Sequence, residues 1–310
     1  MSASGGAKAI IAALLANAGI AAAKFIGFLV TGSSSMLAEA VHSVADTSNQ
    51  GLLLLGQKRS RREATEKHPF GYGRDRYFYS FVVALLLFSL GSVFAIYEGF
   101  HKVENHEQLS SPLVAILILA VAIALEGFSF RTAIGESRPL KGSRTWWQFI
   151  RQAKTPELPV VLLEDAGALL GLVLALGGVG LTVFTGDPVW DAIGTICIGV
   201  LLGVIAVILI RETKSLLIGE GANPAELRTI CDALVGGAVQ RVIHLKTQYL
   251  APDELLIAAK IAVPATLSTA EVATAIDQAE ARVRTALPVA ELIYLEPDLD
   301  RTPAAENAET

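Results

Sequence analysis

The sequence is poor in charged residues and contains almost no cysteine. Charged side chains make up 18% of the 310 residues and hydrophobic ones 52%, whereas soluble domains carry about 25% charge. The two cysteines, Cys197 and Cys231, cannot supply a disulfide framework, and no CxxC metal motif is present. A net charge of -5 argues against nucleic acid as a partner, because nucleic-acid binding requires a basic face. This composition excludes a disordered chain, a coiled coil and a disulfide-stapled secreted domain.

Apolar runs are abundant, and six of them reach the roughly 20 residues that a transmembrane helix needs. They cover residues 7–31, 34–57, 77–100, 112–133, 158–184 and 189–210. The first run is too long for a signal peptide, and the N-terminal segment MSASGGAK carries a single lysine. The pattern predicts a membrane domain over residues 1–211, an all-α bundle of six transmembrane helices.

Two of the predicted loops are strongly basic, and they set the expected orientation. Lys and Arg are concentrated in residues 58–76 and 135–157, whereas the other loops contain few. Because positively charged loops stay on the cytoplasmic side, we expect both basic loops and both termini to be cytoplasmic. No transit peptide is recognisable, which favours the bacterial inner membrane.

The character of the chain changes after Arg211. Residues 212–298 predict a small soluble domain with the order α-β-β-α-β. Asn223 before Pro224 predicts one helix start, and the capping box from Ser268 to Glu271 predicts another. Strands are expected at residues 239–249, 255–263 and 291–295. The tail, residues 299–310, is polar and expected to be disordered.

Ionisable side chains inside the apolar runs are the first candidates for function, because each costs roughly 2.5–3.5 kcal/mol to insert into a membrane. The second run contains Glu39, His42 and Asp46. His42 and Asp46 are four residues apart, so both leave one helix face about one turn apart, and Glu39 lies near the same stripe. Imidazole plus carboxylate suits a divalent transition metal. The alternative is an i, i+4 hydrogen bond that hides the two polar groups from lipid.

The fifth run contains the adjacent carboxylates Glu164 and Asp165. Adjacent helical positions diverge by about 100°, so the two side chains cannot point the same way. Two carboxylates in an apolar run need a cation, a proton or a pore. Together with the histidine and aspartate of the second run they could form a four-ligand metal site. The alternative is pairing within the bundle, with Lys24 or Arg131.

Two segments closely resemble the cation diffusion facilitator family of metal transporters. They are TGSSSMLAEAVHSVADTSNQ (residues 31–50) and HPFGYGRDRYFYS (residues 68–80). The six runs and the C-terminal α-β-β-α-β pattern agree with this resemblance, which covers about residues 7–298. The resemblance implies a ferredoxin-like fold for the cytosolic domain and a homodimer in the lipid bilayer.

The family motifs match this sequence residue by residue, with one departure. The second-span motif, His or Asp followed four residues later by Asp, falls on His42 and Asp46. The fifth-span motif, His and then Asp four residues later, falls on Val161 and Asp165, so its histidine is missing. Glu164 is present instead. The resemblance therefore implies a metal site of His42, Asp46, Asp165 and Glu164.

Smaller features refine the resemblance. The LLED segment and LLIGEGA (residues 216–222) resemble the subgroup that contains the mitochondrial zinc transporter nine. Glu39 and His68 are expected accessory positions, although the loop histidine that often follows His68 by four is Tyr72 here. In the C-terminal domain His244 is the only histidine, and it forms no convincing cluster with Asp253, Glu296 or Asp298. We expect this domain to support a dimer and to lack a strong metal site.

Two functions follow from these observations. The resemblance implies export of a divalent metal from the cytoplasm in exchange for protons, with zinc as the expected cargo. With one nitrogen donor, the site would also tolerate Mn²⁺, Fe²⁺ or Co²⁺. The alternative is a membrane-embedded sensor or regulatory subunit that binds metal without moving it. No enzymatic activity and no tightly bound cofactor are expected.

Overall fold

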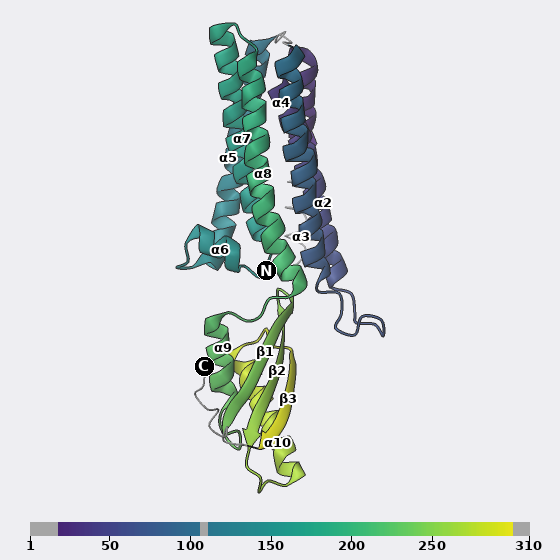
Figure 1. Cartoon of the computed structure of the whole chain (residues 1–310), viewed down its shortest axis with the longest axis vertical. Coiled ribbons are helices and arrows are strands. Elements are labelled where there is room, and N and C mark those ends of the chain that lie inside the picture. The colour runs from purple at the N-terminus through teal and green to yellow at the C-terminus, as the bar shows by residue number, and fades with distance from the viewer. Residues whose placement is uncertain (1–17, 106–110, 300–310) are drawn as a thin grey trace, which may run out of the picture. The chain divides into compact units, whose positions relative to one another are not determined.

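The computed structural model describes residues 18–105 and 111–299, which form two compact units (Figure 1). The described residues up to Arg62 and Asp75–Lys214 form a helical unit. Glu63–Arg74 and the residues from Ser215 onward form the second unit. The loop that follows helix α2 (Ser34–Ser60) therefore clusters with the C-terminal part of the chain. The first half of the first predicted run and almost all of the predicted tail lie outside the described residues.

The helical unit contains a helix in every predicted apolar run. Among the described residues, four helices are long and apolar enough to cross a membrane: Asp75–Asn105, Pro112–Lys141, Glu157–Thr185 and Val189–Ile218. The first of them comprises α3 (Asp75–Leu86), a wider π-helical stretch η1 (Leu87–Val93) and α4 (Phe94–Asn105). The others are α5 (Pro112–Lys141), α7 (Glu157–Thr185) and α8 (Val189–Ile218). A short helix, α6 (Trp146–Gln152), lies in the second basic loop.

The first two predicted spans are less complete. The helix Ala18–Thr31 is apolar but is described only from Ala18. The second, α2 (Ser34–Ser60), has 27 residues and is more polar than the others because it carries the candidate site. The structure thus supports a helical membrane-type unit with four clear spans.

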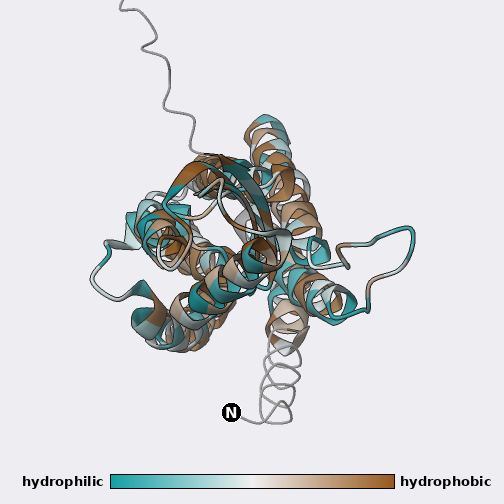
Figure 2. Cartoon of the chain, turned by 90° about the horizontal axis from the view of Figure 1, so that it is seen from below, coloured by the Kyte–Doolittle hydropathy of each residue, from teal (hydrophilic) through white to brown (hydrophobic). Residues whose placement is uncertain are grey.

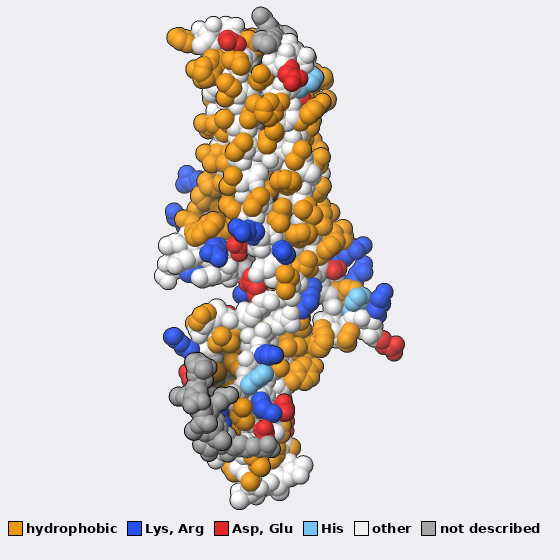
Figure 3. Space-filling model, in the orientation of Figure 1, with side chains coloured by type: hydrophobic (Ala, Val, Ile, Leu, Met, Phe, Trp, Pro, Cys, Tyr) orange, Lys and Arg blue, Asp and Glu red, His pale blue; other side chains and the backbone are white. Residues whose placement is uncertain are grey.

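The outside of the helical unit is apolar. Its helices expose large hydrophobic side chains, including Phe184, Leu113 and Phe128, each more than two-thirds exposed. On the face drawn in Figure 3, hydrophobic side chains cover the middle of the bundle, and Lys and Arg gather toward the end that carries α6. Figure 2 colours much of the loop after α2 as hydrophilic. Such an apolar exterior on helices of this length indicates a lipid-facing surface.

Glycines let α7 and α8 approach closely. A Cβ atom at Gly178 would lie 2.9 Å from the carbonyl oxygen of Trp190, and one at Gly194 would lie 3.3 Å from that of Leu174. Small residues serve helix packing in membranes because they bring backbones together. Since α7 also packs against α2 and α5, it contacts three other long helices of the unit.

Asp191, near the start of α8, holds the turn that precedes α2. Its Oδ1 accepts a hydrogen bond from the Ser33 hydroxyl at 3.0 Å, and its Oδ2 accepts one from the Ser34 backbone N–H at 3.0 Å. The Ser34 hydroxyl is 3.2 Å from the same Oδ2. All three residues are buried. A carboxylate at a helix N-terminus satisfies free N–H groups and the helix dipole, so α8 fixes one end of α2.

Replacing Asp191 with alanine is expected to lower the free energy of unfolding by about 3 kcal/mol, because buried donors lose a charged acceptor. The measurement is thermal unfolding of the purified protein in detergent. Asp187→Ala is the matched control, since Asp187 is exposed and accepts from the Val189 N–H at 3.0 Å. This control should lose at most about 1 kcal/mol. Equal losses in the two variants would show that the Asp191 contacts do not stabilise the fold.

The second unit has the predicted element order. It comprises α9 (Pro224–Leu234), β1 (Arg241–Ala251), β2 (Glu254–Val263), α10 (Thr269–Ala286) and β3 (Leu292–Leu299). The sheet order is β1-β2-β3, with β1 antiparallel and β3 parallel to β2. Apolar side chains from one sheet face and both helices form the core, including Ile230, Ile257, Ile261, Ala279 and Val283.

Both predicted helix starts are confirmed. The side-chain oxygen of Asn223 accepts from the Glu226 N–H at 3.0 Å, and Glu226 accepts in return from the Asn223 N–H at 2.7 Å. The box of Ser268 and Glu271 is equivalent, and the hydrogen bonds from Ser268 lower the pKa of Glu271. The strand ends differ: β1 begins at Arg241, two residues late. β3 continues through Leu299, because its pairing with β2 extends past the last apolar residue of the pattern.

Candidate functional site

The inner face of α2 carries a run of polar side chains. Glu39, His42, Asp46, Asn49 and Gln50 follow one another at short helical spacings and share one side of the helix. Glu39, His42 and Asn49 are buried, and the other two are partly buried. Within the described part of the chain, six nitrogen or oxygen atoms of these side chains are buried without a hydrogen-bond partner: Glu39 Oε1, both ring nitrogens of His42, Asp46 Oδ1, Asn49 Oδ1 and Gln50 Oε1.

His42 and Asp46 meet, as their spacing predicts. His42 Nε2 lies 3.5 Å from Asp46 Oδ2, which is an ion-pair distance and too long for a good hydrogen bond. The contact therefore leaves the hydrogen-bonding capacity of both side chains largely unused. Across residues 18–105 and 111–299, no group of three or more His, Cys, Asp or Glu side chains is arranged to hold a metal ion.

The adjacent carboxylates of α7, Glu164 and Asp165, diverge as expected and bind different helices. Glu164 is buried, and its Oε1 accepts a hydrogen bond from the Asn49 side-chain amide of α2 at 2.7 Å. Asp165 is partly buried, and its Oδ2 accepts from the Ser129 hydroxyl of α5 at 3.1 Å. Glu164 thus faces α2 and Asp165 faces α5. In this conformation neither carboxylate completes a ligand set with His42.

Lys24 pairs with a different carboxylate from those anticipated. Its ammonium group lies 3.2 Å from Glu39 Oε2 and 2.7 Å from the Ser43 hydroxyl, and Glu126 Oε1 is 3.9 Å away. Arg131, the other cation considered for the fifth run, is exposed. Lys24 therefore neutralises Glu39 of α2 and Glu126 of α5. Asn49 and Ser129, which donate hydrogen bonds to Glu164 and Asp165, are neutral.

Several site residues were missed in the sequence. Asn49 lies three residues after Asp46, so helical spacing alone could have placed it on the same polar face of the helix. Ser129 lies three residues after Glu126 in a run of apolar residues, and only the tertiary contact with Asp165 identifies it. Ser43 is similar, because its hydrogen bond to Lys24 depends on a neighbouring helix.

The accessory position His68 lies in the second unit. Its backbone N–H donates to the Thr65 carbonyl at 3.0 Å, and its ring packs on Tyr72 with centroids 4.7 Å apart. The side chain is exposed. Contact with Tyr72, where the family often has a histidine, gives His68 a tilted aromatic neighbour in place of a second ligand.

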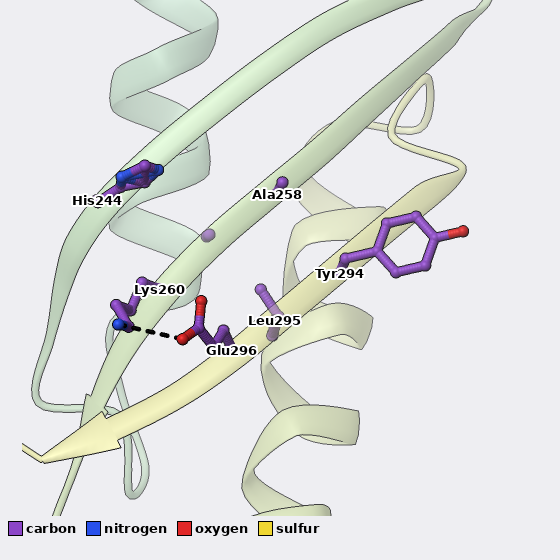
Figure 4. A pocket seen from close by; sticks show the side chains of 7 residues that line it. His244, Ala258, Lys260, Tyr294, Leu295 and Glu296 are labelled. Atoms are coloured by element: carbon purple, nitrogen blue, oxygen red, sulfur yellow. Dashed lines mark ion pairs between the residues drawn. The ribbon is translucent and has the colours of Figure 1, made fainter.

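The outer face of the C-terminal sheet contains a shallow pocket of about 360 Å³. His244, Lys260 and Glu296 lie along it, and Tyr294 points away from them (Figure 4). The Lys260 ammonium is 3.1 Å from Glu296 and 3.2 Å from Asp298. These hydrogen bonds raise the pKa of Lys260. Both carboxylates are therefore engaged by a lysine. That this domain lacks a strong metal site stays a prediction.

The family model for the cation efflux transmembrane domain matches residues 10–218. The mitochondrial proton-coupled zinc antiporter SLC30A9 of Xenopus laevis is 36% identical over 244 residues, which are 77% of this chain and 43% of that protein. Metal tolerance protein C4 of Arabidopsis thaliana is 30% identical over 259 residues, covering 82% and 56%. Magnetosome protein MamB of Magnetospira sp. is 28% identical over 197 residues, covering 63% and 61%. The chain spans less than two-thirds of the length of these curated relatives.

The family match includes α2, α5 and α7, which carry the polar site, and it ends where α8 ends. It thus confirms the resemblance first seen in residues 31–50. It also agrees with the apolar exterior of the helical unit, which indicates a protein that passes through a membrane several times. The chain therefore belongs to the cation efflux family, the cation diffusion facilitators, whose members are transporters and not enzymes.

Proposed function

We propose that this chain exports a divalent metal ion, with Zn²⁺ as the principal cargo, in exchange for protons. The observation that carries the proposal is the set of six buried atoms on α2 without hydrogen-bond partners. Leaving a buried polar atom unsatisfied costs about 1–3 kcal/mol. Three of the six atoms belong to His42 and Asp46, and these three can recover that energy by coordinating a cation.

The proposed ligands are His42, Asp46, Asp165 and Glu164. His42 and Asp46 already lie together, whereas Glu164 and Asp165 are hydrogen-bonded elsewhere. We infer that metal binding exchanges those hydrogen bonds for metal bonds and draws α7 toward α2. A carrier needs such a difference between states, because the site must open to one side of the membrane at a time.

Protons are the ions that this ligand set would exchange for the metal. Imidazole and carboxylates bind metal in their deprotonated forms, so metal and protons compete for the same atoms. The name of the frog relative, a proton-coupled zinc antiporter, supports both zinc as cargo and protons as the exchanged ion. With a single imidazole the site is rich in oxygen donors, so we also expect transport of Mn²⁺, Fe²⁺ or Co²⁺.

The finer architecture is part of the same proposal. We propose six transmembrane helices with both basic loops and both termini in the cytoplasm, a ferredoxin-like C-terminal domain and a homodimer. The gathering of Lys and Arg toward the end of the bundle that carries α6 supports the orientation. The proposed membrane is the bacterial inner membrane, and mitochondria are the competing location, because the curated zinc antiporters are named as mitochondrial.

A metal sensor is the second candidate, and one observation favours it. No three-ligand group is assembled among the described residues, and Glu164 and Asp165 are held by Asn49 and Ser129. A sensor would bind metal weakly and change shape without releasing it to the other side.

A flux assay separates the two functions. Full-length protein in liposomes with an internal metal dye and an imposed pH gradient is expected to move Zn²⁺ against the proton flow. Collapsing the gradient with a protonophore should slow the uptake. Binding of Zn²⁺ without any flux under the same gradient would favour the sensor and contradict the transporter.

A further inference from the structure

Lys24 is a fully buried lysine in an otherwise apolar stretch of helix. Its side chain is 1% exposed, and the paired Glu39 side chain is 0% exposed. Moving a charge out of water is expensive unless it is paired and hydrogen-bonded. Lys24 meets this condition through the carboxylate of Glu39, the hydroxyl of Ser43 and the nearby carboxylate of Glu126. Lys24, Glu39 and Glu126 therefore form a buried charged cluster beside the proposed metal site.

This cluster lies close to the proposed ligands on both α2 and α7. Glu39 lies on α2, three residues before His42, and Glu126 lies on α5, three residues before Ser129, which binds Asp165. Lys24 and Glu126 are both near enough to Asp46 to act on it electrostatically. Glu126 also acts on Asp165. Removing the charge of Lys24 would therefore change the electrostatic potential at the proposed ligands Asp46 and Asp165, although Lys24 is not in contact with them.

The packing around Glu39 holds its carboxylate next to Lys24. Its second oxygen, Oε1, has no hydrogen-bond partner and lies against Gly171 of α7, where a Cβ atom would come within 2.5 Å. The missing side chain of Gly171 leaves room for the carboxylate between α2 and α7. Without Lys24, Glu39 would be an unneutralised buried oxygen donor one helical turn from His42.

We propose that Lys24 is a positioning residue, a tethered cation that occupies Glu39 and Glu126 so that these carboxylates do not bind the transported metal. The inference rests on the proposed function. A carrier must bind its cargo weakly enough to release it, and extra anionic donors in a low-dielectric bundle would retain a dication. Glu39 thereby has an accessory role as the partner of Lys24 and is no ligand of the cargo.

Three variants test this inference. Lys24→Gln frees both carboxylates, and we expect its affinity for Zn²⁺ to rise about tenfold and its flux to fall by a similar factor. Lys24→Arg keeps the charge and should remain within about threefold of wild type. Lys24→Gln combined with Glu39→Gln removes one charge of each sign, so it should return affinity and flux toward wild type. The readouts are equilibrium Zn²⁺ binding in detergent, flux in liposomes and the melting temperature.

A purely structural role for Lys24 gives a different pattern. Lys24→Gln would then lower the melting temperature and leave the Zn²⁺ affinity of the folded protein unchanged, which would overturn the inference. If Lys24→Gln does not fold, the charge-neutral double variant decides, because a folded double variant with flux about tenfold or more below wild type contradicts a role through Glu39. A wild-type protein that binds Zn²⁺ without flux removes the transporter proposal, whereas the affinity change in Lys24→Gln still tests the role of Lys24.

Discussion

Replacing Asp46 with asparagine is expected to reduce metal flux by about 100-fold or more, since even outer-shell changes cost 10–100-fold. Asparagine has nearly the same shape, but it lacks the charge that attracts a dication. Asp46 lies beside His42, and its Oδ1 has no hydrogen-bond partner. Its carboxylate is therefore available to a metal without the loss of an existing hydrogen bond. Initial rates of Zn²⁺ uptake in liposomes under a fixed pH gradient measure the effect.

A matched control on the same helix is Ser48→Ala. Ser48 is exposed, and its hydroxyl donates to the Val44 carbonyl of its own helix at 2.9 Å. This variant should transport at the wild-type rate. Comparing melting temperatures of the two variants separates lost transport from lost folding. If the Asp46→Asn protein folds and transports normally, the α2 side chains do not bind the transported metal.

The local features of this fold could be predicted from the sequence. The helix starts at Asn223 and Ser268 follow from side chains that cap their own helix, so a few neighbouring residues determine them. The contact of His42 with Asp46 follows from one turn of helix in the same way. Each of these interactions depends on sequence separations of four residues or fewer.

The partners of the buried charges could not be predicted in this way. Glu164 binds Asn49, which is 115 residues away in the chain, and Lys24 binds Glu39 across two helices. These pairs depend on how each helix is rotated about its axis relative to its neighbours. Hydropathy reports which residues are buried, but in a bundle with a lipid-facing exterior it distinguishes poorly between inner faces. The sequence therefore identified the charged residues and left their pairing open.

The association of Glu63–Arg74 with the C-terminal unit was also outside the reach of local patterns. This segment lies between two helices in the sequence, yet a Cβ atom at Gly73 would come within 2.6 Å of the Ala251 side chain. Only a glycine permits such a close approach to β1. The loop motif that carried the family resemblance thus also contains a packing contact that was not anticipated.

The adjacent carboxylates of α7, Glu164 and Asp165, are expected to differ in importance. Asp165→Ala should abolish transport, with a loss of about 100-fold or more, because it removes a ligand that four-coordinate metals require. Asp165 is partly exposed and is held by a single hydroxyl, so it is easily released to a metal. Glu164 is buried and held by an amide at 2.7 Å. Glu164→Ala should therefore reduce flux by about tenfold and change the order of metals transported.

Ser129→Ala is the control for the neighbourhood of Asp165, because it removes the hydrogen bond and keeps the carboxylate. It should retain most of the flux. Similar losses in Asp165→Ala and Ser129→Ala would assign the aspartate a structural role. A fully active Asp165→Ala protein would contradict any metal site shared by α2 and α7.

Val161→His then tests whether the missing histidine sets the metal preference. Val161 lies one turn before Asp165 on α7 and is partly buried, so an imidazole there would project on the same side as the aspartate. A second nitrogen donor is softer than a carboxylate and favours Zn²⁺ over Mn²⁺. The ratio of Zn²⁺ to Mn²⁺ flux should rise about tenfold. The ratio of the two fluxes does not depend on the amount of folded protein. An unchanged ratio would therefore mean that position 161 does not face the metal. The metal ligands of α7 would then lie on the face of the helix where Glu164 contacts Asn49.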